Sequence, residues 1–141
     1  MPVDYRISVP HHLVISRAWG VMSDQEMFAH ARNLAADPTF RPDMRQVADL
    51  RHVTRFGLDS ASVDTLVRLN PFGPGARRAL LVGSDVAFGM ARMYQLTREP
   101  APDDVAVFRE VHQALAWLGL AEHAAEVTAL LEADRPPAEP R

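Results

Sequence analysis

Two consecutive segments of the chain each begin as a short apolar run and continue with helical periodicity. The first covers residues 78–95 and the second covers residues 105–118. An apolar run of this kind predicts a buried strand, and the spacing that follows it predicts a helix with one apolar face. Two such units in tandem are typical of an α/β layer.

The part of the chain before these units predicts further strands and helices. Residues 5–9 alternate apolar and polar side chains, as in a half-buried strand, and a tight turn connects them to residues 13–18, which predicts an antiparallel hairpin. Ser23 and Glu26 form a capping-box pattern, in which each side chain accepts a hydrogen bond from a free amide at the start of a helix. Pro38 predicts the end of that helix, because proline disfavours helical geometry in the residue before it.

The middle of the chain predicts a third strand and a second helix. Residues 45–50 have the pattern of a short strand, residues 51–57 are predicted as a loop, and Asp59 or Ser60 is predicted to cap the helix that follows. The expected fold is a single mixed five-stranded sheet flanked by helices, in the order β-β-α-β-α-β-α-β-α with an additional C-terminal helix.

The last part of the chain predicts a helix stop, one more helix and a tail. Gly119 is placed as a left-handed helix terminator, with Leu120 folding back onto the preceding helix. Residues 121–131 have helical periodicity. We expect one domain over residues 1–132 and a disordered proline-rich tail over residues 133–141.

Composition excludes several classes of protein. The chain has 141 residues, enough for one domain, and its net charge of -3 supplies no field for nucleic acid. It has no cysteine, which excludes disulfides and thiol chemistry. No apolar run approaches the ~18 residues of a membrane span, and the start of the chain lacks the apolar core of a signal peptide. A cytoplasmic protein is expected.

Recognised catalytic and metal-binding motifs are missing from the sequence. It contains no nucleophile elbow, phosphate-binding loop or dinucleotide fingerprint, so neither enzymatic activity nor a cofactor is expected. Its six histidines lack metal-ligand spacing: His11 and His12 are adjacent in the predicted hairpin turn, and His30 and His112 are on separate helices. Solvated histidine side chains and no metal site are therefore expected.

The start of the third predicted helix is a candidate binding position. Ser84 follows a strand and opens this helix, where free amides can hold an anion. Asp49 is near the end of the third predicted strand and His52 is in the loop after it, and both could converge with Ser84 at the carboxyl edge of the sheet, the usual binding place in open α/β sheets. Helix capping alone also explains Ser84.

The third predicted helix carries apolar bulk beyond its core stripe. The stripe itself is formed by Ala87, Met90, Ala91 and Tyr94. Three further side chains lie off the core stripes of their helices: Phe88, Arg92 and Trp117. A broad interface with the sheet or the C-terminal helix explains them, and a partner surface or an apolar ligand groove is the alternative. Gly89 within the helix costs about 1 kcal/mol against alanine, so we expect a close neighbour there.

Residues 3–120 resemble a known family in the order of their elements and in several packing and turn positions. The matching positions are Gly20, Asp37-Pro38, Phe40, Asp49-Leu50, Arg78–Leu80, Ser84-Asp85, Phe88-Gly89, Ala91–Met93, Val107–Arg109, Ala114 and Trp117-Leu118. The segment resembles the SpoIIAA-like family, whose fold is similar to that of STAS anti-sigma-factor antagonists and to the CRAL-TRIO lipid-carrier domain.

The resemblance has one departure that concerns regulation. STAS antagonists carry a phosphorylatable serine directly after the aspartate that ends the third strand, whereas here Leu50 follows Asp49. The nearest Asp-Ser pair is Asp59-Ser60, ten residues further on. Ser60 is at a predicted helix start, where a phosphate would be favoured, and helix capping is the simpler interpretation.

Two functions follow as hypotheses. The first is a non-enzymatic regulatory module that binds a protein partner or a second copy of itself as a homodimer, which the resemblance to STAS domains implies. The second is a carrier or sensor of a small apolar or lipid-like molecule, which the resemblance to the CRAL-TRIO domain implies. The pocket would lie between the sheet and the third helix, with Arg92 or Ser84 contacting a polar head.

Overall fold

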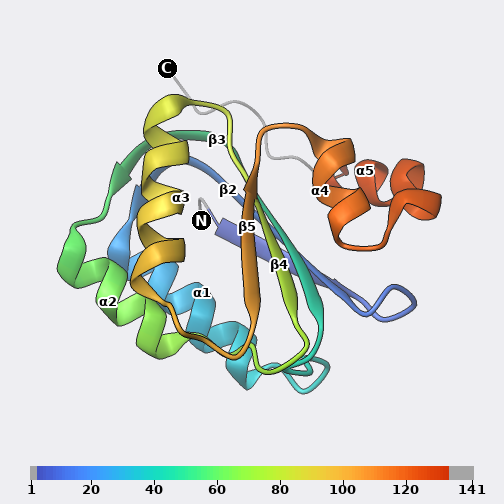
Figure 1. The fold of residues 1–141 in the computed structure, drawn as a ribbon, viewed down its shortest axis with the longest axis horizontal. Helices are drawn as coiled ribbons and strands as arrows, with labels where there is room; N and C mark the ends of the chain where they lie inside the picture. Colours follow the sequence, from blue (N-terminus) through green and yellow to red (C-terminus); the bar gives the residue numbers. More distant parts are fainter. Residues whose placement is uncertain (1–2, 134–141) are drawn as a thin grey trace.

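The computed structural model describes residues 3–133, which form one five-stranded mixed sheet with helices on both of its faces (Figure 1). The elements follow the predicted order, with residues 134–141 of the predicted tail outside the described residues. They are β1 (Val3–Ser8), β2 (Leu13–Ser23), α1 (Asp24–Ala36), β3 (Arg45–Gly57), α2 (Ser60–Leu69), β4 (Arg77–Leu81), α3 (Asp85–Thr97), β5 (Asp104–Phe108), α4 (Val111–Trp117), the 3-10 turn η1 (Ala121–His123) and α5 (Ala124–Glu132).

The strands lie side by side in chain order. β1 is antiparallel to β2, and β2, β3, β4 and β5 are parallel to one another. Because crossovers between parallel strands are right-handed and the strand order never reverses, α1, α2 and α3 all fall on one face of the sheet. α4 and α5 cover the other face (Figure 1). The sheet therefore lacks the switch point at which many open α/β sheets bind their ligands.

The two faces of the sheet have different cores. The face beneath α4 and α5 has one continuous cluster, centred on Leu13, Ile15, Leu115 and Leu131. The face beneath α1, α2 and α3 has two separate clusters, one around Phe40 and Phe72 and the other around Leu80, Val82, Ala87, Ala91 and Val105. A protein interior normally packs without large voids. The division of this second core into two clusters therefore indicates a cavity between them.

Several local predictions are confirmed. Ser23, Asp59 and Ser84 are the N-caps of α1, α2 and α3, and each accepts a hydrogen bond from a backbone amide of the first helical turn. Gly119 has a φ of 76°, and the amide of Leu120 donates to the carbonyl of Leu115, as in a Schellman motif.

Three local predictions are wrong. Residues 51–57 continue strand β3, because β2 itself extends to Ser23 and pairs with them across two irregularities in register. Residues 121–131 do not form one helix, since the turn η1 precedes α5. A methyl group on Gly89 would meet no atom within 4 Å, so nothing approaches this glycine and the structure does not explain it. Within residues 3–133, no helix is long and apolar enough to cross a bilayer.

Candidate functional site

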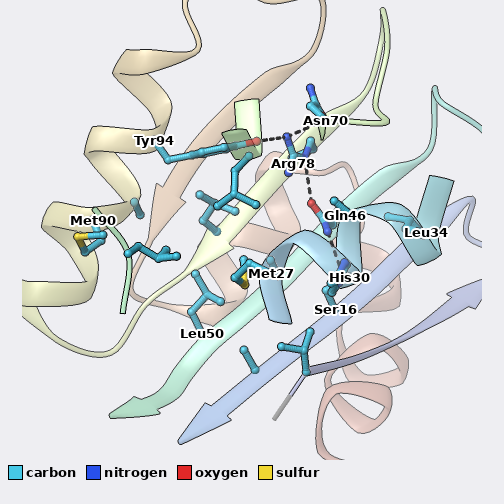
Figure 2. Close-up of a pocket in the computed structure, with 18 of the residues that line it drawn as sticks. Ser16, Met27, His30, Leu34, Gln46, Leu50, Asn70, Arg78, Met90 and Tyr94 are labelled. Atoms are coloured by element: carbon cyan, nitrogen blue, oxygen red, sulfur yellow. Dashed lines mark hydrogen bonds between the residues drawn. The ribbon is translucent and has the colours of Figure 1, made fainter. Parts of the chain in front are cut away.

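A cavity of about 120 Å³ lies between the sheet and helices α1, α2 and α3 (Figure 2). Its wall is largely apolar and includes Met27, Leu50, Leu80 and Met90. The stripe of α3 that the sequence assigned to the core also lines it: Ala87, Met90, Ala91 and Tyr94. An engineered apolar cavity of about 150 Å³ binds benzene, so this volume suits a molecule of roughly that size.

One end of the cavity is polar, because four side chains form a continuous chain of hydrogen bonds there (Figure 2). Nε of Arg78 on β4 donates to Oε1 of Gln46 on β3 at 2.9 Å. Nε2 of Gln46 donates to Oγ of Ser16 on β2 at 2.9 Å, and Nε2 of His30 on α1 lies 2.9 Å from the same hydroxyl. All four residues line the cavity. This series of hydrogen bonds thus extends across the three parallel strands β4, β3 and β2 to helix α1.

Two of the three guanidinium nitrogens of Arg78, Nε and Nη1, donate hydrogen bonds within the fold. Nη1 donates to Asn70, Tyr94 and Asp103 at 3.2, 2.9 and 3.2 Å. The ring of Phe72 lies against the group, 4.6 Å from Cζ to the ring centroid. Within the described residues, no hydrogen bond involves Nη2. Since Arg78 lines the cavity and is only 9% exposed, Nη2 is the donor that remains for a bound group.

The buried charges at this end do not balance. Asp103 on the approach to β5 is 3% exposed, and its carboxylate is shared between Arg78 and Arg98, both of which are also buried. Nε of Arg98 is buried without a hydrogen-bond partner in the described part of the chain. Two guanidinium groups share one carboxylate, and Arg78 is the one of the two that lines the cavity. An anion in the cavity would balance the charge of Arg78 and accept a hydrogen bond from its Nη2.

His30 completes the polar end as a neutral side chain. Burial lowers the pKa of His30 below its usual value, and the nearby charge of Arg78 acts in the same direction. The ring of Tyr5 lies beside it, with 5.6 Å between the ring centroids. Since the hydroxyl of Ser16 accepts from Gln46, its proton is available for Nε2 of neutral His30. The prediction that the histidines are solvated is wrong for His11, which is buried, and for His30, which is half-buried and lies in hydrogen-bond contact with Ser16.

Asp49, His52 and Ser84, which the sequence placed together at the carboxyl edge of the sheet, do not line the cavity. Asp49 points toward α5, not into the cavity: its carboxylate accepts two side-chain hydrogen bonds from Arg51, which also contacts Glu132. Burial opposes the charge of Asp49, but these bonds outweigh it and hold the pKa of the carboxyl below its usual value. His52 is exposed on β3. Ser84 caps α3, as the simpler interpretation required.

The remaining candidates have partners within the fold. Phe88 is half-buried on α3, and the guanidinium of Arg109 covers its ring at 5.0 Å. Arg92 is exposed and donates to Gln95. Trp117 packs on Phe108 on the other face of the sheet, 5.6 Å between ring centroids. None of these side chains lines the cavity.

Ser60 is the first residue of α2 and is exposed. The backbone amide of Ser62 donates to the carboxylate of Asp59. A phosphate at this helix start would compete with that carboxylate for the amide. Phosphorylation of Ser60 therefore stays a prediction.

Sequence reasoning missed the polar end of the cavity, although a signal was present. Gln46 and Arg78 each interrupt an apolar strand, and they are direct partners in the register of β3 and β4. His30 falls on the same face of α1 as Met27 and Leu34, three and four positions away. Polar residues on inward-facing positions of three neighbouring elements indicate a shared buried network.

The chain is an α/β domain of the SpoIIAA-like fold, with a cavity between its sheet and three helices. A solved structure supports this at the level of fold: an uncharacterized protein from Shewanella loihica, of the DUF3478 family and described as having a SpoIIAA-like fold, superposes with a TM-score of 0.54. The two sequences are 17% identical over 82% of this chain and 91% of that protein. No protein-family model and no curated protein matches the sequence.

Proposed function

We propose that this chain is a non-enzymatic binding module whose cavity holds a small amphipathic anion, with a carboxylate at Nη2 of Arg78. The observation that carries the proposal is the buried Arg78 at one end of an otherwise apolar cavity, whose carboxylate partner Asp103 is shared with Arg98. The apolar wall would bury the body of the molecule, at about 25 cal/mol per Å² of apolar surface. The carboxylate would supply the acceptor that Arg78 lacks.

The pair of Ser16 and His30 does not favour catalysis over binding. Their 2.9 Å separation suits a nucleophile and its base. However, Oγ of Ser16 already accepts a hydrogen bond from Gln46, and no hydrogen bond among residues 3–133 joins His30 to an orienting carboxylate. The pair is better explained as the end of the network that begins at Arg78.

The hypothesis of a protein partner stays a prediction. Its anchor was Phe88, whose ring is in contact with Arg109. The large hydrophobic side chains that are exposed on α3 are Val86 and Leu96, near opposite ends of the helix. The cavity therefore supports the ligand hypothesis more directly than the surface of α3 supports a partner.

Calorimetric titration with benzoate, and with benzyl alcohol as a neutral molecule of similar size, tests the proposal. We expect benzoate to bind about tenfold or more tightly than benzyl alcohol, since only the anion satisfies Arg78. Gln46→Glu places a carboxylate beside Arg78 at constant size, and should remove this preference. Gln113→Glu makes the same change at an exposed position of α4 and should leave it unchanged.

Two results would contradict the proposal: no binding of either molecule, or equal affinity for both. Native mass spectrometry of the freshly purified protein, repeated after denaturation, complements the titration. A non-covalent mass that is lost on denaturation would identify a molecule carried from the cell.

A further inference from the structure

The turn between β1 and β2 and the start of α5 bring together three side chains that can bind a metal ion. His11 lies in the turn, His123 is the last residue of η1, and Glu126 is in the first turn of α5. Each offers one ligand atom, and these atoms all lie within 4.8 Å of one another. Two imidazoles and one carboxylate are a ligand set that zinc uses. None of the three residues lines the cavity.

The side chain of His11 distinguishes this cluster from a chance group of exposed residues, because it is buried and one ring nitrogen lacks a partner. It is 8% exposed, and its Nε2 is buried without a hydrogen bond in the described part of the chain. Oε1 of Glu126 lies 3.1 Å from Nε2, but not in the direction of a hydrogen bond. The ring of His123 is tilted by 52° against that of His11, with 4.8 Å between centroids. A buried ring nitrogen without a partner is costly, and a bound cation would supply the partner.

We propose that His11, His123 and Glu126 bind one divalent transition-metal ion of the zinc class. Ligand atoms 2.0–2.1 Å from a tetrahedral ion are about 3.3 Å apart, close to the spacing already present between His11 and Glu126. Since all three ligand atoms lie within 4.8 Å of one another, no pair must approach by more than about 1.5 Å to reach the same spacing. His123 and Glu126 are exposed and free to make this adjustment by rotation. Their exposed side leaves the fourth position to water.

The backbones that carry the three ligands are already fixed in the fold. The guanidinium of Arg45 donates to the carbonyl of His11 and, at 3.0 Å, to that of Leu118, so it joins the turn to the end of α4. Val127, next to Glu126, is fully buried in the core beneath α5. The ion would therefore meet a largely preformed site and would link the first hairpin to the last helix.

Titration of the tag-free, chelator-treated protein with Zn²⁺ alone tests this assignment. We expect one equivalent to bind and affinity to fall about tenfold or more in His123→Gln and in Glu126→Gln, since each removes one of three ligands. His112→Gln replaces an exposed histidine of α4 that is not in the cluster, and should bind as the wild type does.

The exposed positions of His123 and Glu126 keep this test independent of folding. Both variants should retain the circular dichroism spectrum and melting temperature of the zinc-free wild type. Absence of zinc binding by the wild type, or unchanged affinity in the double variant His123→Gln/Glu126→Gln, would overturn the proposal. Benzoate binding is not measured in this experiment, so its result tests the metal site independently of the cavity.

Discussion

Gln46 and Arg78 are direct neighbours across the parallel strands β3 and β4, and a hydrogen bond of 2.9 Å joins Oε1 of Gln46 to Nε of Arg78. The amide of Gln46 can accept there because its nitrogen donates to Ser16. This fixes the guanidinium so that Nη1 faces Asp103 and Nη2 is left for the cavity. One buried amide thus orients the group that would select a ligand.

Gln46→Leu should destabilise the protein by about 2 kcal/mol. The substitution keeps the apolar volume but leaves Nε of Arg78 without its acceptor, and a buried donor that loses its partner costs about 1–3 kcal/mol. Urea unfolding monitored by circular dichroism measures the change. A variant as stable as the wild type would show that water replaces the amide.

Ala91→Leu should fill part of the cavity and prevent benzoate binding. Ala91 on α3 is 5% exposed and lines the cavity, so added methyl groups would occupy empty space and stabilise the fold by about 1 kcal/mol. Ala116→Leu makes the same change on the exposed side of α4, where it should leave binding intact. Thermal unfolding and calorimetry check the two effects. Retained benzoate binding in Ala91→Leu would place the ligand elsewhere.

His30→Gln should weaken the dependence of stability on pH. The pKa of His30 is lowered in the folded state, so below the ordinary histidine value of about 6.5 the unfolded chain binds the proton more readily. The wild type therefore loses stability from this residue as the pH falls from about 7.5 to about 5.5. Urea unfolding at both pH values should show a smaller loss in the variant. Equal losses would indicate that His30 is freely protonated in the folded protein.

Two glycine substitutions should change stability in opposite directions. Gly89→Ala places a methyl group in open space within α3, and should stabilise the protein by about 1 kcal/mol. Gly119→Ala forces a residue with a side chain into a φ of 76° and should destabilise it by about 1 kcal/mol. Both variants are compared with the wild type by thermal unfolding. Destabilisation by Gly89→Ala would point to a contact at α3 that the isolated chain does not show.

The sequence predicted the order of elements because its local signals were strong. The capping box of Ser23 and Glu26, and the glycine stop at residue 119, each depend on a few adjacent residues, and the structure confirms both. Strand β3 was predicted too short because residues 51–57 lack a clear apolar pattern. They are extended because they pair with β2, and pairing partners are distant in the sequence.

The cavity was only partly predictable. The sequence predicted an apolar pocket beneath α3. It proposed Arg92 and Ser84 as the polar contacts of that pocket, since Arg92 lies on α3 and Ser84 directly precedes it. The structure supplies Arg78 and Gln46, which face inward from strands and meet only through the sheet. The cluster of His11 and His123 was not predicted from the sequence either, because its members are more than one hundred residues apart in the sequence and meet only in the folded protein.

The strand order also has a consequence for the time at which each part of the core forms. Because neighbouring strands are consecutive in the chain, each new strand can add to a completed edge while synthesis proceeds. The exception is the surface of β2 that carries Leu13 and Ile15, which packs with Leu131 of α5. This surface stays exposed until α5 has been synthesised, so it is covered later than the core beneath α1, α2 and α3.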